Sequence, residues 1–145
     1  MMASGKSETQ RAATLTRLVL ACDAVVISVT VPLLLLAPQL IADWLGLTSV
    51  VADTRWVLQI VGAGAIALAG HMWLIRRSAD ATVLNAAAIM LINHGVMTLL
   101  VAVMSGEWTT VRWIYLFVSA FFVLVYAALL LWAQRGANSS SPSSQ

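Results

Sequence analysis

The sequence predicts an all-α membrane protein, a four-transmembrane-helix bundle with up-down-up-down topology and both termini on the cytoplasmic side. Three observations predict it. First, 61% of the 145 residues are hydrophobic and 10% are charged, whereas about a quarter of the residues of a soluble domain are charged. Second, four apolar segments are each long enough to cross a bilayer, which takes about 20 residues. Third, the basic residues gather on one side of these segments.

The four apolar segments define one transmembrane domain over residues 16–135, and we expect its spans at about residues 16–38, 56–75, 82–104 and 113–132. Each must be helical, because lipid offers no partners to unpaired backbone groups. The short connections make consecutive helices antiparallel neighbours.

Two further patterns refine the bundle. The stretch "PQLIADWLGL" after the first span predicts a short amphipathic helix at the membrane interface. The small residues of "GAGAIALAG" in the second span, together with those of the third, predict close packing of spans two and three, because small side chains let helix backbones approach.

The basic residues predict the orientation. Two of them, Arg55 and Arg112, lie on one side of the membrane, and six lie on the other: Lys6, Arg11, Arg17, Arg76, Arg77 and Arg135. Since Lys and Arg accumulate in cytoplasmic loops, the side with six is cytoplasmic. Residues 1–15 then form a cytoplasmic N-terminal segment. Residues 136–145 form a Ser-rich tail that we expect to be disordered.

Four polar side chains of the spans suggest a structural cluster. At 1.5 Å per residue, Asp23 lies about 9 Å below the inner boundary, and His71 and Asn85 lie at about 7 Å. Tyr126, at about 13 Å, could reach the same level from below. We therefore predict a contact between Asp23 and His71, with Asn85 and Tyr126 beside them, because a carboxylate in low dielectric favours a nearby imidazole.

The two histidines are the candidate cofactor-binding residues. His94, in the middle of the third span, would either ligate a tetrapyrrole or remain neutral and bond to a carbonyl of another helix. The sequence argues against a haem held by both His71 and His94, because the two differ by about 12 Å in depth. A chlorophyll needs only one axial ligand, and "ALAGH", Ala67 to His71, resembles the small-xxx-His pattern of light-harvesting antenna helices. We expect that no cofactor binds.

Catalytic signatures are absent from the sequence. It contains no HExxH, paired CxxC, P-loop or GxSxG motif. We therefore expect no catalytic residue, no metal site and no enzymatic activity. The scattered basic residues form no stripe that would bind nucleic acid. Asp23 leaves one alternative open, a small proton-coupled transporter, because ionisable residues within spans often serve transport.

Several segments together resemble a group of small bacterial four-span membrane proteins of unknown function. These segments are "LAPQLIADWLGL", "VGAGAIALAG" followed by "RR", "LNAAAIMLINHG" and "SGEW". The resemblance implies a multi-pass protein of the bacterial inner (cytoplasmic) membrane. With so little mass outside the spans, we expect an accessory or scaffold subunit of a larger membrane complex of respiratory or photosynthetic type. Its partners would be lipids and other integral membrane subunits or further copies of itself.

Overall fold

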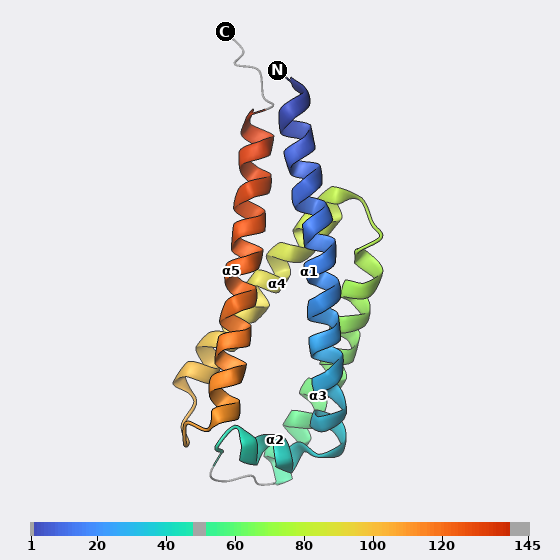
Figure 1. Ribbon diagram of the computed structural model, residues 1–145. Coiled ribbons are helices and arrows are strands. Elements are labelled where there is room, and N and C mark those ends of the chain that lie inside the picture. Colours follow the sequence, from blue (N-terminus) through green and yellow to red (C-terminus); the bar gives the residue numbers. More distant parts are fainter. Residues whose placement is uncertain (1, 48–51, 140–145) are drawn as a thin grey trace.

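The computed structural model describes residues 2–47 and 52–139, which form five α-helices and no strand (Figure 1). The helices are α1 (Met2–Leu36), α2 (Pro38–Trp44), α3 (Ala52–Ile75), α4 (Asp80–Val103) and α5 (Thr110–Ser139). All but α2 are long and apolar enough to cross a membrane, so the chain has the character of a multi-pass membrane protein. The short α2 lies where an amphipathic helix was predicted.

The helices extend beyond the predicted spans at both ends of the chain. Helix α1 begins at Met2, so residues 2–15 continue the first span as helix. This stretch contains three Ala and one each of Met, Lys, Glu, Gln, Arg and Leu, all of which favour helices. Helix α5 ends at Ser139, so residues 136–139 of the tail that was expected to be disordered are helical. Residues 140–145 of that tail lie outside the described residues.

Helix α1 is the centre of the packing. It contacts α3 and α5 along much of its length, and α5 also packs along α4, whereas α3 and α4 scarcely touch. The prediction that spans two and three pack closely is therefore wrong. Gly62 of α3 serves the contact with α1 instead, because a Cβ at this position would come within 3.0 Å of Leu34 Cβ and of Leu35 Cδ2. A small-residue pattern favours close approach but does not name the partner helix.

Buried residues from all four long helices form the core. Its largest fully buried side chains include Leu20 of α1, Met72 of α3, Met90 of α4 and Tyr126 of α5. The remaining faces expose many large apolar side chains. Such faces suit a lipid environment, in which apolar surface needs no cover.

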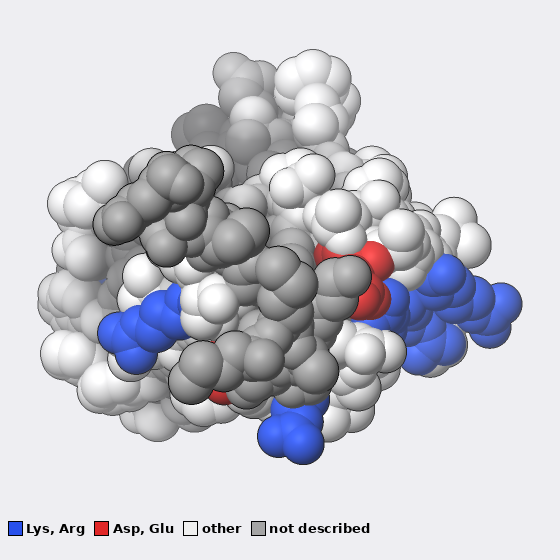
Figure 2. Space-filling view, turned by 90° about the horizontal axis from the view of Figure 1, so that it is seen from above, with Lys and Arg blue, Asp and Glu red and all other residues white. Residues whose placement is uncertain are grey.

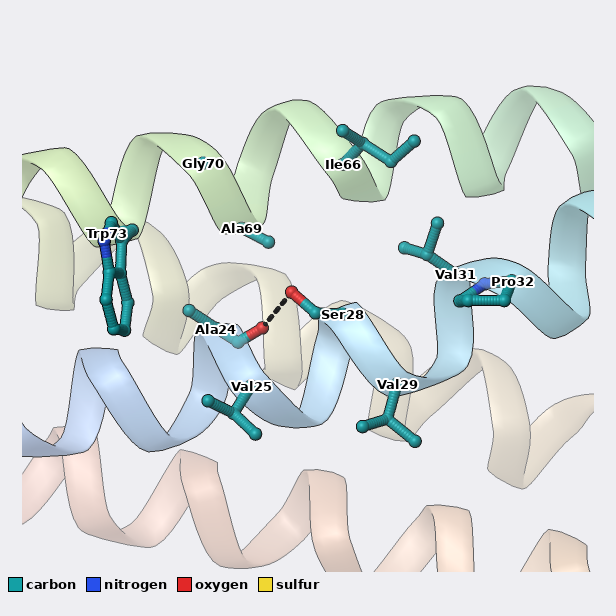
Figure 3. Close-up of a pocket in the computed structure, with 10 residues that line it drawn as sticks. All are labelled: Ala24, Val25, Ser28, Val29, Val31, Pro32, Ile66, Ala69, Gly70 and Trp73. Carbon is teal, nitrogen blue, oxygen red and sulfur yellow. Dashed lines mark hydrogen bonds between the residues drawn. The ribbon is translucent and has the colours of Figure 1, made fainter.

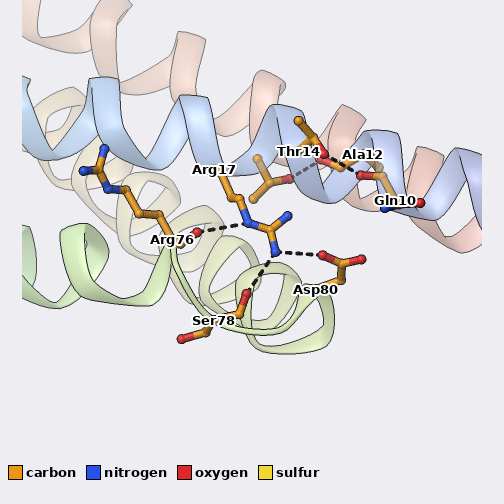
Figure 4. A network of polar contacts seen from close by, with 8 residues as sticks. Gln10, Ala12, Thr14, Arg17, Arg76, Ser78 and Asp80 are labelled. Carbon is orange, nitrogen blue, oxygen red and sulfur yellow. Dashed lines mark hydrogen bonds and ion pairs between the residues drawn. The ribbon is translucent and has the colours of Figure 1, made fainter.

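One end of the bundle, where α1 begins and α5 ends (Figure 1), is held by Arg17. Its guanidinium donates to the carbonyls of Arg76 at 3.0 Å and Ser78 at 2.9 Å, and it pairs with Asp80 Oδ1 at 2.7 Å (Figure 4). These three acceptors lie in the turn between α3 and α4 and at the start of α4. Arg17 thus joins α1 to the turn that connects the two helices.

The opposite end depends on Arg112, which is fully buried. Its guanidinium donates to the carbonyl of Val101 at 2.9 and 3.2 Å and to that of Met104. It also reaches the carbonyls of Gly106 at 3.3 Å and Glu107 at 3.4 Å. The last carbonyls of a helix have no partner within it. Arg112 of α5 therefore caps the C-terminal end of α4 and organises the loop that follows.

Two glycines allow the loop after α2 to meet the loop between α4 and α5. The carbonyl of Gly46 accepts a hydrogen bond from the backbone N–H of Glu107 at 3.1 Å. Gly46 and Gly106 have φ angles of 76° and 123°, and a Cβ on either would run into backbone of the other loop. Side chains rarely tolerate these conformations, so glycine is required at both positions.

Candidate intramembrane polar site

Three helices bring together Asp23, His94 and Tyr126. Asp23 lies on α1, His94 on α4 and Tyr126 on α5. The Tyr126 hydroxyl donates to Asp23 Oδ2 at 2.8 Å, and His94 Nε2 lies 2.9 Å from the same oxygen. Asp23 and Tyr126 are fully buried, and His94 is 8% exposed. We call these three residues the polar cluster.

The proton between Asp23 and His94 has two possible positions. On Nε2 it leaves a carboxylate that accepts two hydrogen bonds on Oδ2. On Oδ2 it leaves both side chains neutral, and the carboxyl group donates to the imidazole. A charge inside a membrane is costly unless it is paired. Both arrangements keep the pair together, so the cluster stabilises the contact between α1 and α4 in either state.

Aromatic rings of α5 fix the plane of the imidazole. The ring of His94 stacks on Phe122 with centroids 5.0 Å apart and an interplanar angle of 16°. It also stacks on Tyr126 with centroids 6.1 Å apart. Because the ring is held against these neighbours, its Nε2 is aimed at Asp23 rather than free to rotate.

Hydroxyl groups fix the backbone of His94 as well. The hydroxyl of Ser119 donates to the carbonyl of His94 at 3.0 Å. The hydroxyl of Thr98, one turn further along α4, lies 2.9 Å from Ser119 Oγ and 2.7 Å from the same carbonyl. These contacts set the position of α4 against α5, so the three residues of the cluster meet with little freedom.

The second oxygen of the carboxyl group of Asp23 is left without a partner. Among the described residues, Oδ1 of Asp23 is the buried side-chain nitrogen or oxygen atom that makes no hydrogen bond. A buried polar atom without a partner is costly, and in native structures it calls for an explanation.

A cavity of about 570 Å³ adjoins the cluster. Its wall takes residues from all four long helices, and Asp23, His94 and Ser119 belong to it. The other lining residues are mostly apolar: Val26, Ile27, Thr30, Leu34, Val61, Gly64, Ala65, Leu68, Asn93, Met97, Ile114, Tyr115 and Val118. Asp23, the residue that carries the unpaired oxygen, is therefore one of those that border an apolar cavity of the bundle.

A second hollow, about 590 Å³ in volume, lies between α1 and α3 and differs in chemistry (Figure 3). Its walls include Val25, Val29 and Ile66, and its hydroxyl group, from Ser28, already donates to the carbonyl of Ala24 at 2.7 Å. This groove presents no charged side chain. We therefore take the cavity beside Asp23 as the candidate site.

The structure brings together some of the residues singled out in the sequence and separates others. Asp23 and Tyr126 meet as members of one cluster. His71 and Asn85 are exposed, and within the described residues no hydrogen bond joins either of them to Asp23. The histidine beside Asp23 is His94, so the expected Asp23–His71 contact is replaced by an Asp23–His94 contact.

The reason lies in the geometry of the helices. Counting residues from the boundary measures distance along a helix axis and equals depth only for a helix perpendicular to the membrane. Helix α4 crosses the bundle obliquely (Figure 1). Counting also says nothing about rotation about the axis, which turns His71 and Asn85 outward.

The geometry bears on the two candidate cofactor residues differently. His94 Nε2 faces Asp23 at 2.9 Å, and one ring face is covered by Phe122, so that nitrogen is not placed to ligate a tetrapyrrole metal. His71 stands exposed on α3, where an axial ligand could be reached from outside the bundle. In the described part of the chain, no three His, Cys, Asp or Glu side chains gather as metal ligands would.

Three residues of the site, Thr98, Ser119 and Phe122, were not predicted to belong to it. Ser119 and Phe122 are spaced by three and four residues with Tyr126 on α5, which places all three on one helix face. His94 and Thr98 are four apart on α4. A polar and aromatic face on α5 and a polar face on α4 could therefore have been found in the sequence, and they predict that the two helices pack together through these faces.

Comparison of the chain with known protein families, with curated proteins and with solved structures finds no match. The resemblance to small bacterial four-span proteins therefore stays a prediction.

Proposed function

We propose that this protein is a non-enzymatic integral membrane protein that binds a small amphipathic molecule inside its helix bundle. The observation that carries the proposal is the cavity of about 570 Å³ whose wall contains a buried carboxyl group with one unpaired oxygen. Binding sites for small molecules are typically cavities of about 300–1,000 Å³ with mostly apolar walls and a few well-placed polar groups. Ionisable residues within membrane spans commonly mark functional sites.

The construction of the site supports this proposal. His94 is held by ring stacking and by hydrogen bonds to its backbone carbonyl, and it helps Tyr126 to hold Asp23. A binding group works best when its neighbours fix it before the ligand arrives.

We further propose that the four spans alternate in direction across the bacterial inner membrane, with both termini cytoplasmic. The end of the bundle where α1 begins and α5 ends carries Arg side chains around its rim (Figure 2). Arg17 and the α3–α4 turn, with Arg76 and Arg77, belong to this end. The positive-inside rule places it in the cytoplasm. Cysteine labelling of intact cells at residue 138 and at residue 107 tests this orientation, since only the latter should react from outside.

Three functions expected from the sequence stay predictions beside this one. An accessory subunit of a larger complex would co-purify with its partner subunits at fixed stoichiometry. A subunit that binds a tetrapyrrole through His71 or His94 would show a visible absorption band. A proton-coupled transporter would lose flux when Asp23 is replaced by Asn. The binding proposal excludes none of these roles.

The experiment compares two variants of α3. A Cβ added at Gly64 or at Gly70 meets nothing within 4 Å, so either position accepts a larger side chain without a backbone clash. Gly64 lines the cavity beside Asp23, whereas Gly70 lines the second hollow, between α1 and α3. Gly64→Leu should fill the cavity, and Gly70→Leu is its matched control.

We expect wild type and Gly70→Leu, purified gently in native lipid nanodiscs, to retain a small molecule as added mass in native mass spectrometry. Gly64→Leu should lose it. If Gly64→Leu retains the same added mass as wild type, or if wild type retains none, the cavity is not a binding site and the proposal fails.

A further inference from the structure

We propose that the cavity selects molecules whose polar end donates a hydrogen bond, a hydroxyl or N–H group on an apolar body, and that Asp23 Oδ1 is the acceptor. This inference rests on the proposed binding function and names the chemical class of the ligand. It follows from which donors and acceptors of the site are already used.

The donors of the polar cluster are taken. The Tyr126 hydroxyl donates to Asp23 Oδ2, and His94 Nε2 faces the same oxygen. The hydroxyl of Ser119 donates to the carbonyl of His94. A carboxyl oxygen has room for two hydrogen bonds, so Oδ2 is saturated while Oδ1 has none. The site therefore has one unpaired acceptor, Asp23 Oδ1, and favours a ligand that donates a hydrogen bond to it.

The other polar residues of the cavity, Tyr115, Thr30 and Asn93, do not change this balance. The hydroxyl of Tyr115 is already hydrogen-bonded to the side chain of Thr30. The hydroxyl of Thr30 bonds to backbone carbonyls of its own helix, at 2.8 Å to Ile27 and 3.1 Å to Val26. The amide of Asn93 carries both a donor and an acceptor and so favours neither class of ligand. Asp23 is the carboxyl group of the wall, and its free oxygen decides the preference.

The rest of the wall determines the body of the ligand. Leu34, Val61, Leu68, Met97 and Ile114 present apolar surface from all four long helices. The cavity lies among membrane spans, and α3 and α4, which both line it, scarcely touch each other. A lipid-soluble molecule that enters from the bilayer between α3 and α4 fits these walls.

A single bound water explains the cavity less well. One water could satisfy Oδ1, but a water takes about 30 Å³ in the liquid and needs two to four polar partners. The cavity is about 570 Å³ and mostly apolar. A water at Oδ1 would leave most of that volume unfilled, whereas an apolar molecule with one donor satisfies the oxygen and fills the space.

Two probes of nearly the same shape test the inference. The hydroxyl of 4-nonylphenol donates a hydrogen bond, and 4-nonylanisole, its methyl ether, has no donor. Binding of each radiolabelled probe is measured to wild-type protein in lipid nanodiscs, with empty nanodiscs subtracted to remove partitioning into lipid. We expect the phenol to bind at least about 10-fold more tightly, because only the phenol can donate a hydrogen bond to Asp23 Oδ1.

Asp23→Asn sharpens the test because it is nearly isosteric. The Tyr126 hydroxyl donates to the atom at the Oδ2 position, so the amide oxygen takes that place and the amide NH₂ lies where Oδ1 was. The unpaired acceptor becomes a donor, and the phenol should lose its advantage to within about 3-fold of the anisole. If this variant does not fold, the ratio of the two probes on wild type still decides.

The outcomes separate the two proposals. If both probes bind equally to wild type and both are lost in Gly64→Leu but not in Gly70→Leu, the cavity is a binding site and the selection for donors is overturned. If neither probe binds wild type above empty nanodiscs, both proposals fail. A phenol preference that persists unchanged in Asp23→Asn overturns the assignment of Asp23 as the acceptor.

Discussion

Asp23 and His94 are 71 residues apart in the chain, yet Oδ2 of one lies 2.9 Å from Nε2 of the other. Tyr126 completes the arrangement from a third helix. One carboxyl group thus joins α1, α4 and α5 inside the bundle, and it does so through one of its two oxygens. The stability of the bundle and the chemistry of its cavity depend on the same side chain.

Removing the imidazole should destabilise the protein strongly. His94→Leu leaves Asp23 buried with Tyr126 as its remaining partner, and loss of one member of a buried charged pair costs about 3–5 kcal/mol. With the tyrosine bond kept, we expect about 3 kcal/mol. The free energy of unfolding, measured by SDS titration in mixed micelles, reports this loss. His71→Leu, on an exposed residue, should change it by less than about 0.5 kcal/mol. Equal effects of the two substitutions would refute the assigned pairing.

The tyrosine hydroxyl should contribute a smaller amount that depends on Asp23. Tyr126→Phe keeps the ring beside His94 and removes the bond to Oδ2. Hydrogen bonds between membrane helices are worth about 0.6 kcal/mol on average and up to about 1.7 kcal/mol. We expect Tyr126→Phe to lower the free energy of unfolding by about 1 kcal/mol. This value lies above the average because the acceptor is a carboxyl group. A double-mutant cycle with Asp23→Asn should show a coupling of at least about 0.5 kcal/mol, and additive effects would show that the bond is not made.

Arg112 should not be replaceable by lysine. Its planar guanidinium reaches four carbonyls around the end of α4, which the single ammonium of a lysine cannot do. Hydrogen bonds to charged groups contribute about 1.5–3 kcal/mol each, so Arg112→Lys should cost at least about 2 kcal/mol in the same titration. Arg55 is exposed, and Arg55→Lys is its matched control with no measurable effect expected. A tolerated Arg112→Lys would mean that the α4 carbonyls find other partners.

Replacement by alanine should destabilise the protein at Gly106, in a loop, and stabilise it at Gly95, in a helix. Gly106→Ala places a Cβ at positive φ and against the carbonyl of Gly46, so it should destabilise the protein by more than about 1 kcal/mol. Gly95 lies within α4 with nothing within 4 Å of an added Cβ. Gly95→Ala should raise stability by up to about 1 kcal/mol, because alanine favours a helix. Melting temperatures of the two variants should therefore move in opposite directions, and a shift of the same sign would contradict the described loop.

Four spans could be predicted from the sequence because length and apolar composition alone decide whether a helix crosses a bilayer. The partner of Asp23 could not, because it depends on helix tilt and rotation. The role of Arg112 could not be predicted from the sequence either. In the sequence it is only one of two basic residues on the predicted non-cytoplasmic side. Its hydrogen bonds to the end of α4 depend on how α4 and α5 pack.

The wide separation of the polar cluster along the chain has a consequence for biogenesis. A ribosome makes Asp23 first, His94 71 residues later and Tyr126 103 residues after Asp23. During synthesis the first span therefore carries a carboxyl group without its native partners until the last span has been inserted. A chain that stops early keeps this group exposed to lipid or to the insertion machinery. The cluster thus forms only once the helix that carries Tyr126 has been made, and a chain that stops before Tyr126 cannot complete it.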